Sequence, residues 1–270
     1  MKNLFDLKNK VALITGGSGV LGSQMGHALA QYGVTVGIMG MTLAEAEAVA
    51  NDIISNGGNA FSVEANVLDK LSLENVRDQI VDKYGKLDIL INAAGGNMPG
   101  ATIAPDKAIY DLLTDDLQKV LNLNIIGTIL PSQVFSEVFA KQNSGVIINI
   151  SSASATRPLT RVVGYSASKA AVDNFTKWMA VEMATKFGEG IRVNAIAPGF
   201  FIGEQNRTLL LNPDGSLTAR GSKIIEQTPM KRFGVPEDLS GTLIWLCSDA
   251  SKFVTGISVN VDGGFGVSSI

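Results

Sequence analysis

The sequence of 270 residues has one cysteine and one histidine, so it offers few of the side chains that form disulfides or bind transition metals. Cys247 has no partner for an internal disulfide and lies in an apolar stretch, which predicts a small buried side chain in a reducing compartment. His27 falls in the first expected helix and is predicted to be a surface or capping residue. Because thiols and imidazoles are so scarce, we predict no metal site.

Basic residues are not in excess either, since 22 lysines and arginines stand against 25 aspartates and glutamates, a formal net charge of −3. This balance argues against a nucleic acid or an anionic membrane surface as partner. The N-terminal stretch MKNLFDLKNK lacks the apolar core of a signal peptide, and no apolar run has the length expected of a membrane span. We therefore expect a cytoplasmic protein with no membrane partner.

The chain does contain an alternation of short β-rich runs and longer helical patterns, in a composition with 46% apolar residues. Several runs are almost continuously apolar, which is typical of strands covered on both faces. The alternation predicts one α/β domain over residues 1–270, a Rossmann fold whose doubly wound parallel sheet has about seven strands and helices on both faces. The expected strands are Val11–Thr15, Val34–Met39, Ala60–Val63, Ile89–Asn92, Val146–Ile150, Arg192–Ala197 and Ser258–Val261.

Two longer stretches interrupt this rhythm. Gly95–Asp111 follows the fourth expected strand, and Gly199–Gly234 follows the sixth, with a short helix expected around Arg220–Gln227. Ligands bind at the carboxyl ends of strands in open α/β sheets, and long loops there are usually functional. We predict that residues 199–234 form a substrate loop or lid.

A glycine-rich turn follows the first expected strand and precedes a helical pattern. Its sequence from Gly17 to Gly22 matches GxGxxG, which lets the backbone approach a pyrophosphate at a helix N-terminus. A plain tight turn between strand and helix is the alternative. The predicted cofactor contacts in this turn are Gly16, Ser18, Gly19, Val20, Leu21 and Gly22.

The end of the second expected strand normally reads the adenosine ribose of a dinucleotide. Here it carries Gly40 and Met41, with neither the acid that favours NAD nor an arginine for the 2′-phosphate of NADP. An unpaired phosphate would be costly to bury, so the sequence favours NAD over NADP.

Tyr165 and Lys169 are four residues apart at the start of a helical pattern, so their side chains share one helix face. A neighbouring ammonium favours the phenolate, which would lower the tyrosine pKa from about 10 and make the phenol a general acid–base. An ordinary surface pair is the alternative.

Two further polar residues support the catalytic interpretation. Ser152 follows the fifth expected strand, where a hydroxyl can hydrogen-bond a substrate oxygen as charge develops on it. Asn124 stands among apolar neighbours in a helical stretch, either for catalysis or as a structural residue that distorts the helix with a bound water.

Taken together, these motifs resemble the short-chain dehydrogenase/reductase family over essentially the whole chain. The resemblance also includes Asn92-Ala93-Ala94-Gly95, Pro198-Gly199 and Asp262-Gly263-Gly264. It departs from the family pattern at Val20, where the glycine turn usually has glycine, and at Gly203, where a threonine often follows Pro-Gly.

The resemblance implies an enzyme that moves a hydride between NAD or NADP and a carbonyl or alcohol. It implies that Ser152 polarises the substrate oxygen, Tyr165 transfers the proton, Lys169 lowers the tyrosine pKa and binds the nicotinamide ribose, and Asn124 holds a water. Asn66 and Val67 would lie beside the adenine. The other cofactor contacts implied are Asn92, Ala93, Ala94, Gly95, Pro198, Gly199 and Phe201.

Within the family, the stretch from Phe200 to Gly234 is similar to a D-mannonate oxidoreductase (fructuronate reductase) subgroup. A sugar-acid pocket needs a cation for the carboxylate and polar groups for the hydroxyls. The substrate-binding candidates besides Ser152 are Asn97, Arg157, Arg161, Glu204, Gln205 and Arg207, each of which could instead be a solvated loop residue. A gluconate 5-dehydrogenase or a 3-oxoacyl reductase is the alternative, and a non-catalytic NAD(H)-binding protein is a more remote one.

The helix after Tyr165 is apolar on two sides, with Phe175, Trp178 and Val181 opposite the Tyr165 face. A helix with so little polar surface is expected to be buried on both sides. We therefore predict a homodimer or homotetramer in which this helix packs against a partner subunit.

Overall fold

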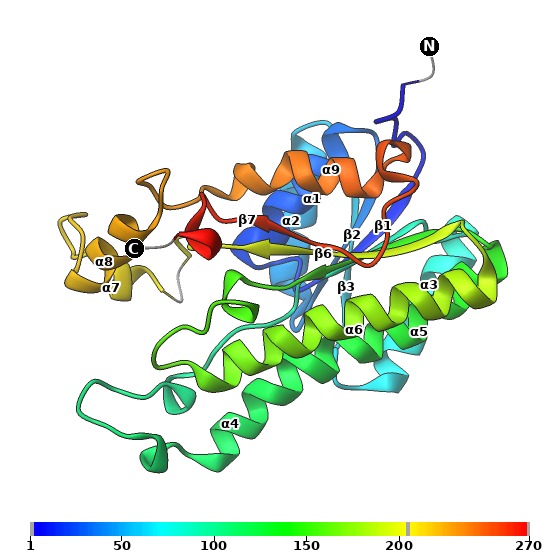
Figure 1. Ribbon diagram of the computed structural model, residues 1–270. Coiled ribbons are helices and arrows are strands. Elements are labelled where there is room, and N and C mark those ends of the chain that lie inside the picture. The colour runs from blue at the N-terminus through cyan, green and yellow to red at the C-terminus, as the bar shows by residue number, and fades with distance from the viewer. Residues whose placement is uncertain (1–2, 204–205, 269–270) are drawn as a thin grey trace.

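Seven parallel strands form one sheet in the computed structural model, which describes residues 3–203 and 206–268 (Figure 1). The strand order is β3-β2-β1-β4-β5-β6-β7, so the winding direction reverses between β1 and β4. Ligand crevices in open α/β sheets lie at such a reversal, outside the carboxyl ends of the strands. The strands are β1 (Val11–Thr15), β2 (Thr35–Gly40), β3 (Asn59–Glu64), β4 (Ile89–Asn92), β5 (Gly145–Ile150), β6 (Ile191–Pro198) and β7 (Ser258–Val261).

Helices cover both faces of the sheet because successive strand residues point to opposite sides. On β1, Ile14 packs into the core beneath α1 (Val20–Gln31), α2 (Leu43–Ser55) and α9 (Ser240–Cys247). Leu13 belongs to the opposite core, beneath α3 (Lys70–Tyr84), α5 (Gly127–Gln142) and α6 (Val163–Phe187). Figure 1 shows these two groups of helices above and below the sheet.

The predicted fold class is confirmed, and every predicted strand is present with its ends within one residue of the expected position. Residues 199–234 contain more structure than the single expected helix. Besides α8 (Ala219–Gln227) there is a one-turn helix, α7 (Arg207–Leu210), which leads into a bridge between Leu211 and Leu217. The bridge joins two segments of the loop, a pairing that no local period reveals.

A long helical run crosses the face of the sheet, from α4 (Thr114–Leu121) through α5 to Gln142. By length and composition it could span a membrane, although the sequence pattern had not indicated such a run. Half of its most apolar segment is buried inside the protein, where α5 packs on β4, β5, α3 and α6. Its hydrophobicity is therefore explained by the core of the fold.

Buried amide side chains connect the two central strands to the helices that cover them. Asn92 of β4 donates to Ser132 of α5 and to Asn149 of β5, each at 2.8 Å. Asn149 in turn donates to Thr176 of α6 at 2.8 Å. Buried polar groups are stable when they are paired in this way, so the network fixes α5 and α6 relative to the strand ends that they cover.

The single cysteine and the single histidine both contact structural parts of the fold. Cys247 is buried at the end of α9, and burial raises the pKa of its thiol to about 12, as expected of an unreactive core cysteine. His27 of α1 lies 3.0 Å from Asp52 of α2, measured from Nε2 to Oδ2, and so joins two neighbouring helices.

Candidate active site

The four predicted catalytic residues converge at the carboxyl ends of β4 and β5. Ser152 is the second residue after β5, and Tyr165 and Lys169 lie on the first two turns of α6. Asn124 lies between α4 and α5 and hydrogen-bonds the loop that follows β4. Four residues from three segments of sequence thus form one cluster at the sheet edge where ligands bind in this fold.

Lys169 is the most buried charged group of this cluster, with 4% of its surface exposed. Its Nζ donates to the carbonyl of Ile150 at 2.8 Å and lies 5.5 Å from the centre of the Tyr165 ring. Burial lowers the pKa of Lys169 to about 8, while the nearby Asp173 acts in the opposite direction. The ammonium therefore begins to lose its proton in the physiological range.

The pKa of Tyr165 moves in the direction opposite to the one predicted from sequence. Burial raises the pKa of the phenol above its ordinary value, and a hydrogen bond with the Ser152 side chain only partly opposes this. The expected lowering by Lys169 is not observed, because loss of hydration is the largest effect on the phenolate. Near neutral pH the phenol of Tyr165 is therefore protonated and can donate its proton.

Asn124 both distorts its helix and reaches the cluster. Its side-chain amide donates to the carbonyl of Val120 at 2.8 Å, and residues 122–126 form a π-helical turn. The same side chain donates to Gly96 O at 2.7 Å and accepts from Gly96 N at 3.1 Å. A side chain added at Gly95 would contact both Asn124 and Lys169, so this glycine permits their close approach. Such π-turns occur frequently at functional sites.

The glycine turn has the geometry needed to hold a diphosphate. Gly16 adopts a left-handed φ of 62°, and an added Cβ would lie 2.8 Å from the backbone of Ala94, so the turns after β1 and β4 pack closely. Gly19 precedes α1, whose first turn has no acidic residue and no side-chain cap. The N-terminal amides of α1 are therefore available to an anion.

The two departures from the family pattern are neighbours in space. A Cβ added at Gly203 would lie 3.9 Å from Val20 Cγ2, so the larger residue in the glycine turn faces a residue without a side chain. Asn206 is a polar group close to this position, since it donates to Phe201 O and accepts from Gly203 N. The backbone at 201–203 is thus held by this chain's own asparagine.

The remaining predicted cofactor residues line the same edge. Gly40 ends β2 and Met41 follows it, and a Cβ at Gly40 would lie 3.4 Å from the Ser18 hydroxyl. Asn66 accepts from Leu68 N at 2.9 Å, which engages its oxygen in a local turn. Also at this edge are Leu21 and Gly22 in α1, Val67 after β3, Asn92, Ala93, Ala94 and Gly95 at the end of β4, and Pro198, Gly199 and Phe201 at the end of β6.

The substrate candidates differ in what their side chains contact. Arg157 donates to Gln227 and to Phe265 O, so its guanidinium connects the end of α8 to the C-terminal segment. Arg161 donates from Nε to Ile103 O at 2.7 Å, and Asn97 donates to Thr102 at 2.7 Å. Arg207 is exposed on α7. Glu204 and Gln205 lie outside the described residues.

Three polar residues at this edge were not identified from the sequence. Ser154 is buried two residues after Ser152, and its hydroxyl has no hydrogen-bond partner in the described parts of the chain. Glu64 at the end of β3 accepts from Leu43 N, the first residue of α2. Arg220 lies in the first turn of α8. Only the position of each after a strand or in a loop could have indicated them, because their importance depends on contacts across the chain.

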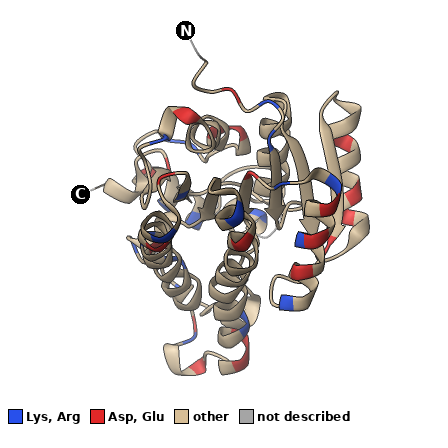
Figure 2. Cartoon of the chain, turned by 90° about the vertical axis from the view of Figure 1, so that its right-hand side faces the viewer, with Lys and Arg blue, Asp and Glu red and all other residues tan. Residues whose placement is uncertain are grey.

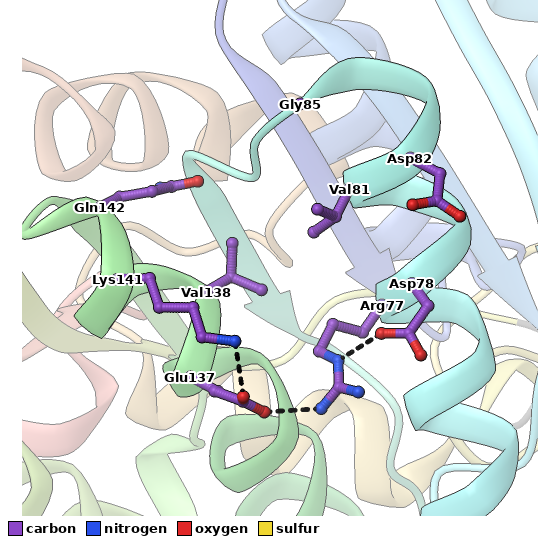
Figure 3. Close-up of a pocket in the computed structure, with 9 residues that line it drawn as sticks. All are labelled: Arg77, Asp78, Val81, Asp82, Gly85, Glu137, Val138, Lys141 and Gln142. Carbon is purple, nitrogen blue, oxygen red and sulfur yellow. Dashed lines mark hydrogen bonds and ion pairs between the residues drawn. The ribbon is translucent and has the colours of Figure 1, made fainter.

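A surface pocket between α3 and α5 lies at the opposite edge of the sheet, since both helices end there just before β4 and β5 begin (Figure 3). Four of its charges are paired with one another: Arg77 contacts Asp78 and Glu137, and Glu137 also contacts Lys141. On that side of the molecule acidic and basic residues are interspersed (Figure 2). This paired pocket has no connection to the cluster around Tyr165.

A doubly wound sheet with a glycine turn after β1 and a Ser–Tyr–Lys group beside it defines a nicotinamide-dependent oxidoreductase acting on an alcohol or a ketone. Comparison with known families agrees, because the model described as short chain dehydrogenase matches residues 10–211. The chain belongs to the short-chain dehydrogenase family.

Individual relatives match almost the whole chain. It is 48% identical over 269 residues to the uncharacterized oxidoreductase UxuB of Bacillus subtilis (strain 168), covering 96% of each chain. It is 41% identical to a proposed D-mannonate oxidoreductase of Haemophilus influenza solved with bound NAD, with a TM-score of 0.90 and 98% and 97% coverage. A gluconate 5-dehydrogenase of Burkholderia cenocepacia J2315, solved with NADP and tartrate, is 29% identical with a TM-score of 0.89, covering 99% of this chain and 98% of that one.

Proposed function

We propose that this enzyme interconverts the ketone and alcohol forms of a sugar acid, most specifically D-fructuronate and D-mannonate, with Tyr165 as the proton donor and acceptor. The observation that carries the proposal is the convergence of Asn124, Ser152, Tyr165 and Lys169 beside the glycine turn. The resemblance to a proposed D-mannonate oxidoreductase supports the choice of substrate.

The residues of the glycine turn fit a dinucleotide. A Cβ at Gly22 would collide with Gly16 O, so the turn requires glycine to keep its shape. The amides at the start of α1 would hold the diphosphate, and Lys169 would donate to the nicotinamide ribose. When bound, the nicotinamide supplies or accepts the hydride.

The chemistry of this chain's own residues follows from the geometry. Ser152 donates a hydrogen bond to the substrate oxygen, and the protonated phenol of Tyr165 delivers its proton as negative charge develops there during ketone reduction. In the reverse direction the phenolate is needed, so alcohol oxidation should increase as the pH rises. The raised pKa of Tyr165 favours its role as an acid.

The ribose end of the site favours NAD over NADP for two electrostatic reasons. No lysine or arginine occurs between Lys10 and Lys70, the stretch that contains β1, β2 and β3. The Glu64 carboxylate reaches the N-terminus of α2 and hydrogen-bonds Leu43 N at 3.1 Å. A 2′-phosphate placed there would meet a negative charge and no cation.

A substrate panel tests the proposed function. We expect the highest kcat/KM with D-fructuronate and NADH, measured by the loss of NADH absorbance, and at least tenfold lower values with NADPH. D-tagaturonate, 5-ketogluconate and an acetoacetyl ester are the comparison substrates. Faster turnover of the acetoacetyl ester than of every sugar acid would reject the proposed substrate class and favour a 3-oxoacyl reductase.

The lowered pKa of Lys169 predicts a pH effect on cofactor capture. The ammonium is present below pH 8 and lost above it, so kcat/KM for NADH at saturating ketone should fall with a midpoint near pH 8. In Lys169→Arg the guanidinium stays charged over this range. The kcat/KM for NADH of this variant should be lower than that of the wild type but constant between about pH 7 and 9.5. A flat wild-type profile, or the same fall in the arginine variant, would contradict this assignment.

Residues 199–234 are proposed to act as the substrate lid, and α6 to form a subunit interface. One side of α6 packs in the core, while Trp178 and Val181 on the other side are 60% and 68% exposed. Exposed aromatic and aliphatic groups on one helix are typical of surfaces that bind a partner. A dimer or tetramer measured by sedimentation would support the proposal, and a monomer at working concentration would reject it.

A further inference from the structure

Two arginines at the edge of the proposed substrate site have no anionic partner. Arg161 lies two residues before α6, and Arg220 lies in the first turn of α8. Both are half-buried, and no carboxylate in the described part of the chain lies within ion-pair distance of either. Other cations of the lid differ: Arg232 pairs with Asp238, and Lys231 donates to Glu226 O.

Arg161 is held in place by unusual backbone geometry. Its φ is 77°, a left-handed conformation that is strained for a bulky residue. Two hydrogen bonds brace it against the loop after β4: Ile103 N donates to its carbonyl at 2.9 Å, and its Nε donates to Ile103 O at 2.7 Å. The terminal nitrogens of the guanidinium have no acceptor among the described residues, and such strain is typical of ligand sites.

Arg220 adds a second positive charge where the fold already disfavours one. It follows the N-terminus of α8, whose first turn contains no acidic residue. A helix N-terminus is electropositive and therefore repels a cation. The segments that carry the two arginines are joined by the hydrogen bond from Arg157 to Gln227, which links the loop before α6 to α8. Burial lowers the pKa of Arg220, and the positive charge of Arg161 acts in the same direction.

The position of the pair relates it to the catalytic cluster. Arg161 precedes Tyr165 by four residues, and Arg157 in the same loop donates to Gln227 at the end of α8 at 2.6 Å. The loop before α6 and α8 are thus adjacent, at the edge of the sheet to which β5 and β6 point (Figure 1). An anion held by Arg161 would therefore be bound four residues before Tyr165, in the loop that leads into α6.

We propose that Arg161 and Arg220 together bind the carboxylate of the substrate and so select sugar acids over neutral ketoses. This inference rests on the proposed function and specifies which end of the substrate faces the lid. A carboxylate between them neutralises two uncompensated cations and accepts charge-assisted hydrogen bonds from the free guanidinium nitrogens. Of the three arginines predicted from the sequence, only Arg161 keeps this role, because Arg157 is engaged within the protein and Arg207 is exposed.

The test compares an acid with its neutral counterpart. D-fructose has the carbon chain of D-fructuronate with a hydroxymethyl group in place of the carboxylate. Arg220→Gln and Arg161→Gln should lower kcat/KM for D-fructuronate by about 10- to 100-fold and leave D-fructose turnover within about twofold. Arg220→Lys should restore part of the activity toward the acid. Lys223→Gln removes an exposed positive charge from the same helix, α8, and is the matched control, which should match the wild type.

A structural role would give a different result. Removing Arg220 relieves a repulsion, so the thermal midpoint of Arg220→Gln should not fall. Loss of a residue that stabilises the fold would lower the thermal midpoint and reduce the turnover of both substrates equally. If D-fructuronate turnover is unchanged in both glutamine variants, the carboxylate site is rejected and the proposed function stands. If the wild type does not reduce D-fructuronate, calorimetry measures the binding of D-mannonate to the enzyme–NADH complex instead. D-mannonate binding that is present in the wild type and lost in Arg220→Gln supports the carboxylate site. Absence of D-mannonate binding to the wild type rejects it.

Discussion

Replacing Tyr165 with phenylalanine is expected to lower kcat for ketone reduction by about 10²–10⁴-fold, because it removes the proton donor and little else. The phenol is positioned by α6 with its ring 5.5 Å from Lys169 Nζ, and the Ser152 side chain hydrogen-bonds it. Phenylalanine retains the ring and its packing. Stopped-flow or steady-state absorbance measures turnover, and fluorescence titration measures NADH affinity.

The controls separate chemistry from folding. NADH affinity and the thermal midpoint of Tyr165→Phe should remain close to those of the wild type, since the phenol hydroxyl is not part of the core. Tyr110→Phe makes the same chemical change at a tyrosine that is 86% exposed, and its activity should be unaffected. Turnover of Tyr165→Phe equal to that of the wild type would remove the acid–base assignment from this residue.

The second large effect is expected from Gly22→Ala. An added Cβ would collide with Gly16 O and lie 2.9 Å from Gly17 Cα, so the backbone of the turn itself would have to move. Overpacking of this kind typically destabilises a fold by about 1–3 kcal/mol, which lowers the thermal midpoint of a domain of this size by several degrees. NADH should bind at least tenfold more weakly, because the displaced turn presents the α1 amides in the wrong positions.

Gly19→Ala is the matched variant in the same turn. Gly19 has an ordinary extended φ of −74°. A Cβ added there would lie 3.4 Å from Gly16 O, which is a normal contact distance. Its free energy of unfolding should stay within about 0.5 kcal/mol of the wild type. Differential scanning calorimetry of both variants is the measurement, and equal stability of the two would show that the turn does not need glycine at position 22.

Local pattern was enough to predict the sheet and the positions of the cluster. Several strands are recognisable because burial on both faces makes them almost continuous apolar runs. Tyr165 and Lys169 share a face because residues four apart are neighbours on a helix of about 3.6 residues per turn. Ser152 was expected at a strand end and is found there. These are properties of residues close together in the chain.

Electrostatic properties were predicted less well, since they depend on how much water surrounds a group. The sequence places an ammonium one turn from Tyr165 and so suggests a lowered tyrosine pKa. Loss of hydration instead raises the pKa of Tyr165 and lowers that of Lys169. In the same way, Arg157 looked available for a ligand until its contacts with Gln227 and Phe265 were visible.

The amino-acid sequence by itself determined the doubly wound sheet, the glycine turn and the spacing of Tyr165 and Lys169, since each follows from periods of a few residues. The tertiary structure alone decided that Val20 faces Gly203, that Glu64 reaches the start of α2, and that the loop before α6 contacts α8 through Arg157 and Gln227. Burial and charge act through space, so the partners of a side chain are set by segments that are far apart in the chain.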